Sequence, residues 1–123
     1  MLKNNVEVGI NKLTISVRKY FSFKEIGYLL DSASRGSRYW SDSEQLGFEN
    51  TIYDLLNLGK EIKIHDFEEE KDYFLDLKSV KRGLTVMAKK ESIHYADFIK
   101  GDYDQTTGDV FLQCCLFGEV IYG

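Results

Sequence analysis

The segment from residue 107 to residue 117 constrains the fold more than any other part of the sequence. It contains the run Val-Phe-Leu-Gln-Cys-Cys-Leu-Phe, in which almost every position is apolar, and Thr106 and Asp109 ahead of this run are spaced like a box-type helix cap. A helix that is apolar nearly all round must be covered by other elements on most sides. We therefore expect a last helix at about 107–117 that is buried at the centre of the core.

Four more helices are predicted from capping residues and from apolar residues at helical spacing. The clearest begins at Ser22, because Ser22 and Glu25 are spaced as a capping box, and Gly36 provides a stop. Comparable signals predict helices at about 48–58 with Gly59 as its stop, at about 77–90 with Asp76 as its cap, and at 92–100 before Gly101. Residues 34–47 are small and polar around an aromatic pair, which predicts a loop.

Alternating apolar side chains predict three strands, at residues 12–20, 60–67 and 72–77. A charged hairpin tip, Glu68-Glu69-Glu70-Lys71, separates the last two strands. Residues 1–11 alternate with the opposite parity to the residues after them, which indicates a bulge, a turn or a loosely ordered leader. About three antiparallel strands and four to five helices, in an order without regular alternation, predict a single compact α+β domain over residues 1–123.

The composition is that of one globular domain in a reducing compartment. The chain has 123 residues, of which 43% are hydrophobic and 29% charged. It has no run of about 18 apolar residues and no signal-peptide pattern, so we expect a soluble cytoplasmic protein. The two cysteines, Cys114 and Cys115, are neighbours and cannot form a disulfide framework.

The charge is unevenly distributed along the chain. Residues 1–40 carry a net charge of +4 and the rest of the chain carries −8, which gives −4 overall. An acidic chain is a poor general binder of nucleic acid, because contacts to phosphates supply most of the non-specific affinity. Such a chain can still meet a basic surface of a protein partner, and the charges would then steer the encounter.

No motif in the sequence predicts catalysis, a metal site or a cofactor. His65 and His94 have no cysteine or carboxylate at a metal-ligand spacing, and His65 is expected to face solvent. The cysteines lie in an apolar run, whereas a catalytic thiol needs an exposed, electropositive setting. No P-loop, dinucleotide-binding or nucleophile-elbow motif is present. We therefore expect a protein that is not an enzyme, without catalytic residues, metal or cofactor.

The first candidate for binding a partner is the loop around the aromatic pair, where Arg35, Arg38, Tyr39 and Trp40 lie close together in the sequence. Arginine, tyrosine and tryptophan are the residue types that dominate the energetics of protein interfaces. The same residue types form stacking platforms for single-stranded nucleic acid. The alternative is that Trp40 turns inward as part of the core and the two arginines keep the loop soluble.

The second candidate is the densest run of acidic residues, which comprises Asp66, Glu68, Glu69, Glu70 and Asp72. Its ordinary interpretation is a solvated hairpin tip whose charges protect the edge of the sheet. The functional alternative is an array of carboxylates that imitates nucleic-acid phosphates and occupies the basic groove of a partner. The partner would then be a basic or nucleic-acid-binding protein.

The C-terminal third, from Ala96-Asp97 to the end Asp109-Val-Phe-Leu-Gln-Cys-Cys-Leu-Phe-Gly-Glu-Val-Ile-Tyr-Gly, resembles small uncharacterised proteins of Gram-positive phages, plasmids and integrated elements. These proteins end similarly, in an apolar helix followed by Leu-Phe-Gly-Glu and an apolar Tyr-Gly. They also have a similar Tyr-Trp pair after a turn that contains glycine. The resemblance implies a mobile genetic element as the source, and small acidic proteins of such elements are often inhibitors of host defence of the anti-CRISPR type.

These features together predict a non-enzymatic inhibitor that binds a host defence protein, such as a CRISPR effector nuclease, stoichiometrically in the bacterial cytoplasm. The alternative is a nucleic-acid-associated accessory factor of the mobile element that uses the basic N-terminal region. Neither function involves a membrane. The identity of the partner and the oligomeric state are left open by the sequence.

Overall fold

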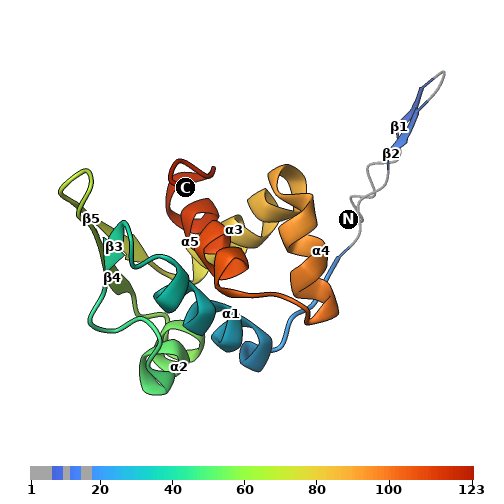
Figure 1. Ribbon diagram of the computed structural model, residues 1–123. Helices are drawn as coiled ribbons and strands as arrows, with labels where there is room; N and C mark the ends of the chain where they lie inside the picture. Colours follow the sequence, from blue (N-terminus) through green and yellow to red (C-terminus); the bar gives the residue numbers. More distant parts are fainter. Residues whose placement is uncertain (1–6, 10–11, 15–17) are drawn as a thin grey trace.

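Five helices, a three-stranded antiparallel sheet and a two-stranded hairpin make up the part of the chain that the computed structural model describes, which is residues 7–9, 12–14 and 18–123 (Figure 1). In chain order the elements are β1 (Glu7–Gly9), β2 (Lys12–Thr14), α1 (Phe23–Gly36), β3 (Ser41–Asp42), α2 (Glu49–Leu58), β4 (Ile62–Asp66), β5 (Lys71–Leu75), α3 (Leu77–Lys90), α4 (Ser92–Lys100) and α5 (Gln105–Phe117). The predicted α+β class is confirmed.

Helix α5 lies at the centre of the fold and packs mainly against α1 and α3 (Figure 1). Every residue from Thr107 to Leu116 is buried, so the prediction of a buried last helix is confirmed. Two glycines allow the close packing on either side. A side chain at Gly108 would overlap the backbone of α1, and a side chain at Gly83 of α3 would overlap Cys115. Helix α5 is therefore enclosed at van der Waals distance by two other helices.

Most helix ends follow the sequence signals. The Ser22 hydroxyl accepts a hydrogen bond from the Glu25 N–H at 3.1 Å, and the Glu25 carboxylate accepts one from the Ser22 N–H at 3.2 Å, so the predicted capping box is confirmed. Asp76 caps α3 as expected, and Gly59 ends α2 in the left-handed conformation. These local signals are sufficient because capping involves residues only a few positions apart.

The predicted cap of α5 is wrong. The capping residue is Asp104, whose carboxylate accepts hydrogen bonds from the N–H groups of Thr106 at 2.9 Å and Thr107 at 3.4 Å. Asp109, which the spacing suggested as the partner of Thr106, is instead buried in the interior. The helix begins two residues earlier than predicted for this reason.

The main sheet has the strand order β3-β4-β5 and is antiparallel throughout. In β4, Ile62 and Ile64 face the core, whereas the alternate residues Lys63 and His65 face away from it, as predicted for His65. None of the helices in the described ranges is both long and apolar enough to cross a membrane.

The prediction of a strand at residues 12–20 is wrong. Strand β2 covers Lys12–Thr14 and pairs with β1, residues 15–17 lie outside the described part, and residues 18–20 form no strand. The third strand of the main sheet is instead β3, whose Ser41 pairs with Asp66. Alternation does not identify a two-residue strand, nor does it show which strand pairs with which. Of the leader expected at residues 1–11, residues 1–6 and 10–11 lie outside the described part, and Glu7–Gly9 form β1.

Candidate protein-binding surfaces

Trp40 belongs to a buried polar network that joins the α1–β3 connection to α5. Its side chain is fully buried, and its Nε1–H donates a hydrogen bond to Asp109 Oδ1 at 2.7 Å. The Tyr39 hydroxyl donates to Asp109 Oδ2 at 2.6 Å, and Gln113 Nε2 donates to Oδ1 at 3.0 Å. Burial, together with the nearby Asp109 carboxylate, raises the pKa of Tyr39 to about 12. One buried carboxylate thus accepts three hydrogen bonds from three different side chains.

The same network holds the C-terminal tail against the domain. Gln113 Oε1 accepts hydrogen bonds from the N–H groups of Ile121 at 2.9 Å and Tyr122 at 2.8 Å. The Tyr122 ring stacks on Trp40 with 5.2 Å between the ring centroids, and its hydroxyl donates to Asp66 Oδ2 at 2.7 Å. Among the described residues, every buried side-chain nitrogen or oxygen has a hydrogen-bond partner. We call these residues the Asp109 network and assign it a structural role.

The Asp109 network corrects the part of the aromatic-loop prediction that concerns Trp40. Because Trp40 lies inside the core, it cannot anchor a partner, and the alternative that it turns inward is the one observed. Tyr39 is 48% exposed, but its hydroxyl already has a partner inside the protein. Arg35 is exposed and forms an ion pair with Asp31 at 2.8 Å, one helical turn away. Arg38 is also exposed.

The backbone at the tip of the β4–β5 hairpin is held in place by hydrogen bonds to a buried residue, Asp66. Asp66 is fully buried, which corrects its assignment to the exposed acidic run. Its Oδ1 accepts hydrogen bonds from the N–H groups of Glu68 at 2.9 Å and Glu69 at 3.1 Å. The N–H of Phe67 donates to the carbonyl oxygen of Trp40 at 3.1 Å. The turn is therefore tied to the core through its backbone, while its side chains remain exposed.

His65 lies between two of the hairpin carboxylates. Its Nδ1 is 2.7 Å from Asp72 Oδ1, and its Nε2 is 3.5 Å from Glu70 Oε2. The hydrogen bond to Asp72 is the main cause that raises the pKa of His65, and the charges of both carboxylates act in the same direction. A protonated His65 therefore cancels part of the negative charge of the hairpin, and deprotonation restores it.

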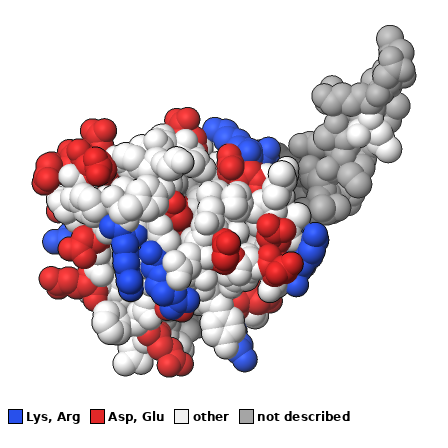
Figure 2. All heavy atoms as spheres, viewed as in Figure 1, with Lys and Arg blue, Asp and Glu red and all other residues white. Residues whose placement is uncertain are grey.

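Strand β3 adds carboxylates to this surface that the sequence analysis did not include. Asp42 is paired with His65 across the β3–β4 ladder, and Glu44 follows shortly after β3. A hollow of about 550 Å³ lies between these residues and the outer face of β4 and β5. The exposed carboxylates belong to Asp42, Glu44, Glu68, Glu69, Glu70 and Asp72. We call them the acidic hairpin surface, and Figure 2 shows Asp and Glu side chains gathered at the corner where Figure 1 places the hairpin tip.

The two cysteines and His94 lie in surroundings that indicate a role in packing. Burial raises the pKa of the Cys114 thiol to about 11 and also raises the pKa of Cys115, so both stay protonated near neutral pH. His94 Nδ1 lies 2.9 Å from the hydroxyl of Thr107. Within residues 18–123 and the two short strands before them, no three histidine, cysteine, aspartate or glutamate side chains are grouped to hold a metal ion.

A second surface, which the sequence analysis missed, lies along α3. A groove of about 510 Å³ separates α3 from the start of α1, and it is lined by apolar side chains and by Lys19, Lys81 and Lys89. We call it the α3 groove. The sequence signal that could have revealed it is the charge of α3, which carries five basic residues and no acidic one. The charge difference between the N-terminal 40 residues and the rest of the chain concealed this local excess.

Compared with known proteins, the chain matches no family model, no curated protein and no solved structure.

Proposed function

We propose that the protein is a non-enzymatic inhibitor that binds its partner stoichiometrically, and that the acidic hairpin surface meets a basic surface of that partner. On the basis of the resemblance to proteins of mobile elements, the proposed partner is a host defence protein such as a CRISPR effector nuclease. Such a nuclease needs a basic groove to hold nucleic acid. The observation that supports the proposal is a set of six exposed carboxylates, three of which, Glu68, Glu69 and Glu70, lie on a turn that Asp66 ties to the core.

The fixed backbone of the tip is what distinguishes this surface from an ordinary charged turn. A carboxylate on a mobile loop loses conformational entropy when it binds, whereas a preorganised one loses less. Opposite charge also speeds the encounter between two proteins. The hairpin is a better candidate than the aromatic loop, because the tryptophan that would anchor that loop is buried.

A second candidate function, that of a nucleic-acid-associated accessory factor, is favoured by a different observation. Helix α3 carries the basic residues Lys78, Lys81, Arg82, Lys89 and Lys90. This function predicts a salt-dependent gel shift with single-stranded DNA. The absence of a shift at low salt and micromolar protein would exclude it.

The proposed function is tested by comparing three baits in a pull-down from a Gram-positive lysate with identification by mass spectrometry. The baits are the wild type, the triple variant Glu68→Gln/Glu69→Gln/Glu70→Gln, and a control with the same net charge. The control is Glu49→Gln/Asp102→Asn/Glu119→Gln, which changes exposed carboxylates outside the acidic hairpin surface. We expect one partner to be captured by the wild type and the control and to be depleted with the triple variant.

Two results would contradict the proposal. The first is equal capture of the partner by all three baits, which would show that the hairpin carboxylates are not involved. The second is catalytic turnover of a nucleotide or nucleic acid by the pure protein, which would show that it is an enzyme.

With a purified nuclease as partner, inhibition of cleavage should be complete at a fixed molar ratio of the two proteins, as expected for stoichiometric binding.

A further inference from the structure

The α3 groove follows one side of helix α3 along most of its length. Leu77, Lys81, Leu84 and Ala88 all line it and are three or four residues apart, so they form a single stripe on the helix. From the first to the last of these residues the stripe is about 16 Å long. Gly83, on another side of α3, packs against α5. Helix α3 thus contributes one side to the core and a second side to the groove.

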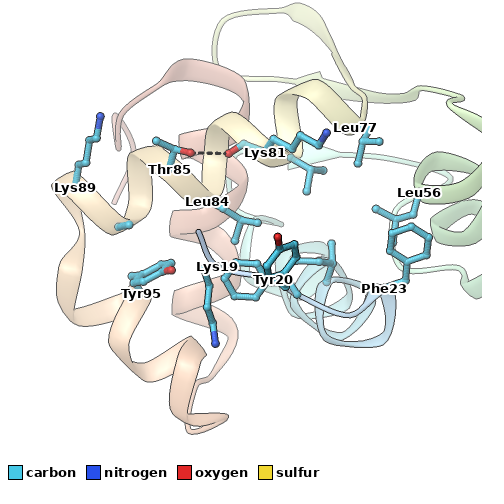
Figure 3. A pocket seen from close by; sticks show the side chains of 14 residues that line it. Lys19, Tyr20, Phe23, Leu56, Leu77, Lys81, Leu84, Thr85, Lys89 and Tyr95 are labelled. Atoms are coloured by element: carbon cyan, nitrogen blue, oxygen red, sulfur yellow. Dashed lines mark hydrogen bonds between the residues drawn. The ribbon is translucent and has the colours of Figure 1, made fainter. Parts of the chain in front are cut away.

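The opposite wall of the groove is aromatic and exposed. Tyr20 is 77% exposed and Phe23 is 50% exposed, and both precede or begin α1. Figure 3 shows Tyr20 across from Leu84, with Phe23 and Leu56 at the end of the groove nearest Leu77. Exposed apolar side chains gathered around a hollow mark interaction sites more often than isolated ones do. Aromatic residues are also enriched where proteins bind one another.

The charges that line the groove all have one sign. Lys19, Lys81 and Lys89 are among its lining residues, whereas none of the described lining residues is an aspartate or a glutamate. Lys81 and Lys89 are separated by slightly more than two helical turns, or about 12 Å. None of the three lysines forms an ion pair with another described residue. Within the described part of the chain, the groove therefore combines an apolar floor with positive charge that no carboxylate of the lining compensates.

We propose that the α3 groove binds an acidic amphipathic helix of a protein partner, about three to four turns long. The apolar face of such a helix packs on Leu77, Leu84 and Ala88 of α3, and carboxylates on its flanks pair with Lys81 and Lys89 on one side and with Lys19 on the other. A concave floor of aliphatic side chains fits the ridge of a helix better than it fits a flat bilayer. It also offers few hydrogen-bonding groups to nucleic-acid bases.

This contact is additional to the proposed function and does not depend on it. No residue that lines the α3 groove belongs to the acidic hairpin surface. The two surfaces also have opposite charge, so they select different features of a partner. A test with a synthetic peptide needs no knowledge of the natural partner, so its failure would leave the hairpin proposal untouched.

The test measures the binding of three fluorescein-labelled peptides of about 14 residues by fluorescence anisotropy at low salt. The first peptide has leucines at helical spacing and glutamates on both flanks. The second has lysine in place of each glutamate, and the third has the composition of the first in a scrambled order without an apolar face. We expect the first peptide to bind at least about tenfold more tightly than either of the others.

A charge-swapped variant makes the test specific to the groove. Lys81→Glu/Lys89→Glu should weaken binding of the glutamate peptide by about tenfold and should strengthen binding of the lysine peptide. The circular dichroism spectrum of the variant must match that of the wild type, because an unfolded acidic chain could also bind a cationic peptide. The matched control is Lys63→Glu/Lys100→Glu, which has the same net charge, changes two exposed lysines outside the groove and should behave like the wild type.

The proposal is overturned if the glutamate peptide binds the wild type and Lys81→Glu/Lys89→Glu equally, or binds no more tightly than its scrambled counterpart. Two further probes identify a different occupant. These are a single-stranded oligonucleotide and vesicles of phosphatidylglycerol, tested with the same variants. Binding of either probe that the charge swap abolishes, without binding of the glutamate peptide, would also overturn the proposal and assign the groove to that ligand.

Discussion

The Asp109 network and the acidic hairpin surface use the same chemical group in opposite ways. In the network, the buried Asp109 carboxylate accepts three hydrogen bonds, so its removal leaves donors without a partner. On the acidic hairpin surface, six carboxylates lie in water, and those of Glu68, Glu69 and Glu70 can be neutralised at little cost to the fold. Asp66 shows that sequence position does not decide between these roles, because it lies within the acidic run and yet is buried and fully hydrogen-bonded.

The largest effect is expected from Phe111→Ala, in the middle of α5. The Phe111 side chain is fully buried, and its removal leaves a cavity between α5 and its neighbours. The free energy of unfolding should fall by about 3–5 kcal/mol. Urea unfolding followed by circular dichroism measures this change. An unchanged urea midpoint would show that α5 is peripheral. The Asp109 network would then not lie in the stabilising core.

Asp109→Ala should come second, because it leaves the Trp40 indole N–H and the Tyr39 hydroxyl without their acceptor. A loss of about 2–4 kcal/mol is expected from two unpaired donors. Asp109→Asn keeps one acceptor oxygen and should cost less. It should also lower the pKa of Tyr39 from about 12, which a spectrophotometric titration detects. Equal stability losses in the two variants would contradict the role given to this carboxylate.

His65→Gln should have a smaller effect that depends on pH. Because the folded state raises the pKa of His65, the charged imidazole stabilises the hairpin fully below its ordinary pKa of about 6.5. This contribution is lost as the pH rises through the raised value. The difference in Tm between wild type and variant should therefore be largest below about pH 6.5 and should shrink as the pH rises above this value. Asp72→Asn weakens the interaction that contributes most to the raised pKa of His65, so an NMR titration should show a lower pKa for His65 in this variant. A constant difference in Tm would contradict the proposed coupling.

The smallest effect on stability is expected from Glu68→Gln/Glu69→Gln/Glu70→Gln. These side chains are exposed at the tip, so the free energy of unfolding should change by no more than about half a kcal/mol. Association with the captured partner should nevertheless slow, and its salt dependence should flatten, as stopped-flow measurements would show. A large loss of stability would mean that the hairpin carboxylates belong to the fold, as Asp109 does.

Local and short-range features could be predicted from the sequence, but pairings between distant segments could not. The capping box of Ser22 and Glu25 and the burial of α5 follow from residues a few positions apart. The inward orientation of Trp40 depends on Asp109, which is 69 positions away. The two-residue strand β3 exists only because β4 lies beside it. Neither of these pairings leaves a periodic pattern in the sequence.

In the candidate surfaces, too, residues that are neighbours in the sequence could be predicted, whereas residues brought together from distant segments could not. The sequence identified four of the six exposed hairpin carboxylates, because they are neighbours in the chain. It missed Asp42 and Glu44, which join them only through the β3–β4 ladder. It also missed the α3 groove, whose walls come from residues 19–26 and 77–89, because nothing local indicates that these segments face each other.

The pairing of α1 with α5 has a consequence for the time course of folding in the cell. Translation proceeds at about 5–20 residues per second, so Asp109 is made roughly 3 to 14 seconds after Trp40. During that interval, the indole and the apolar face of α1 lack the helix that covers them in the native state. The core can therefore close only after α5 has emerged from the ribosome, and until then the uncovered apolar face of α1 can bind chaperones.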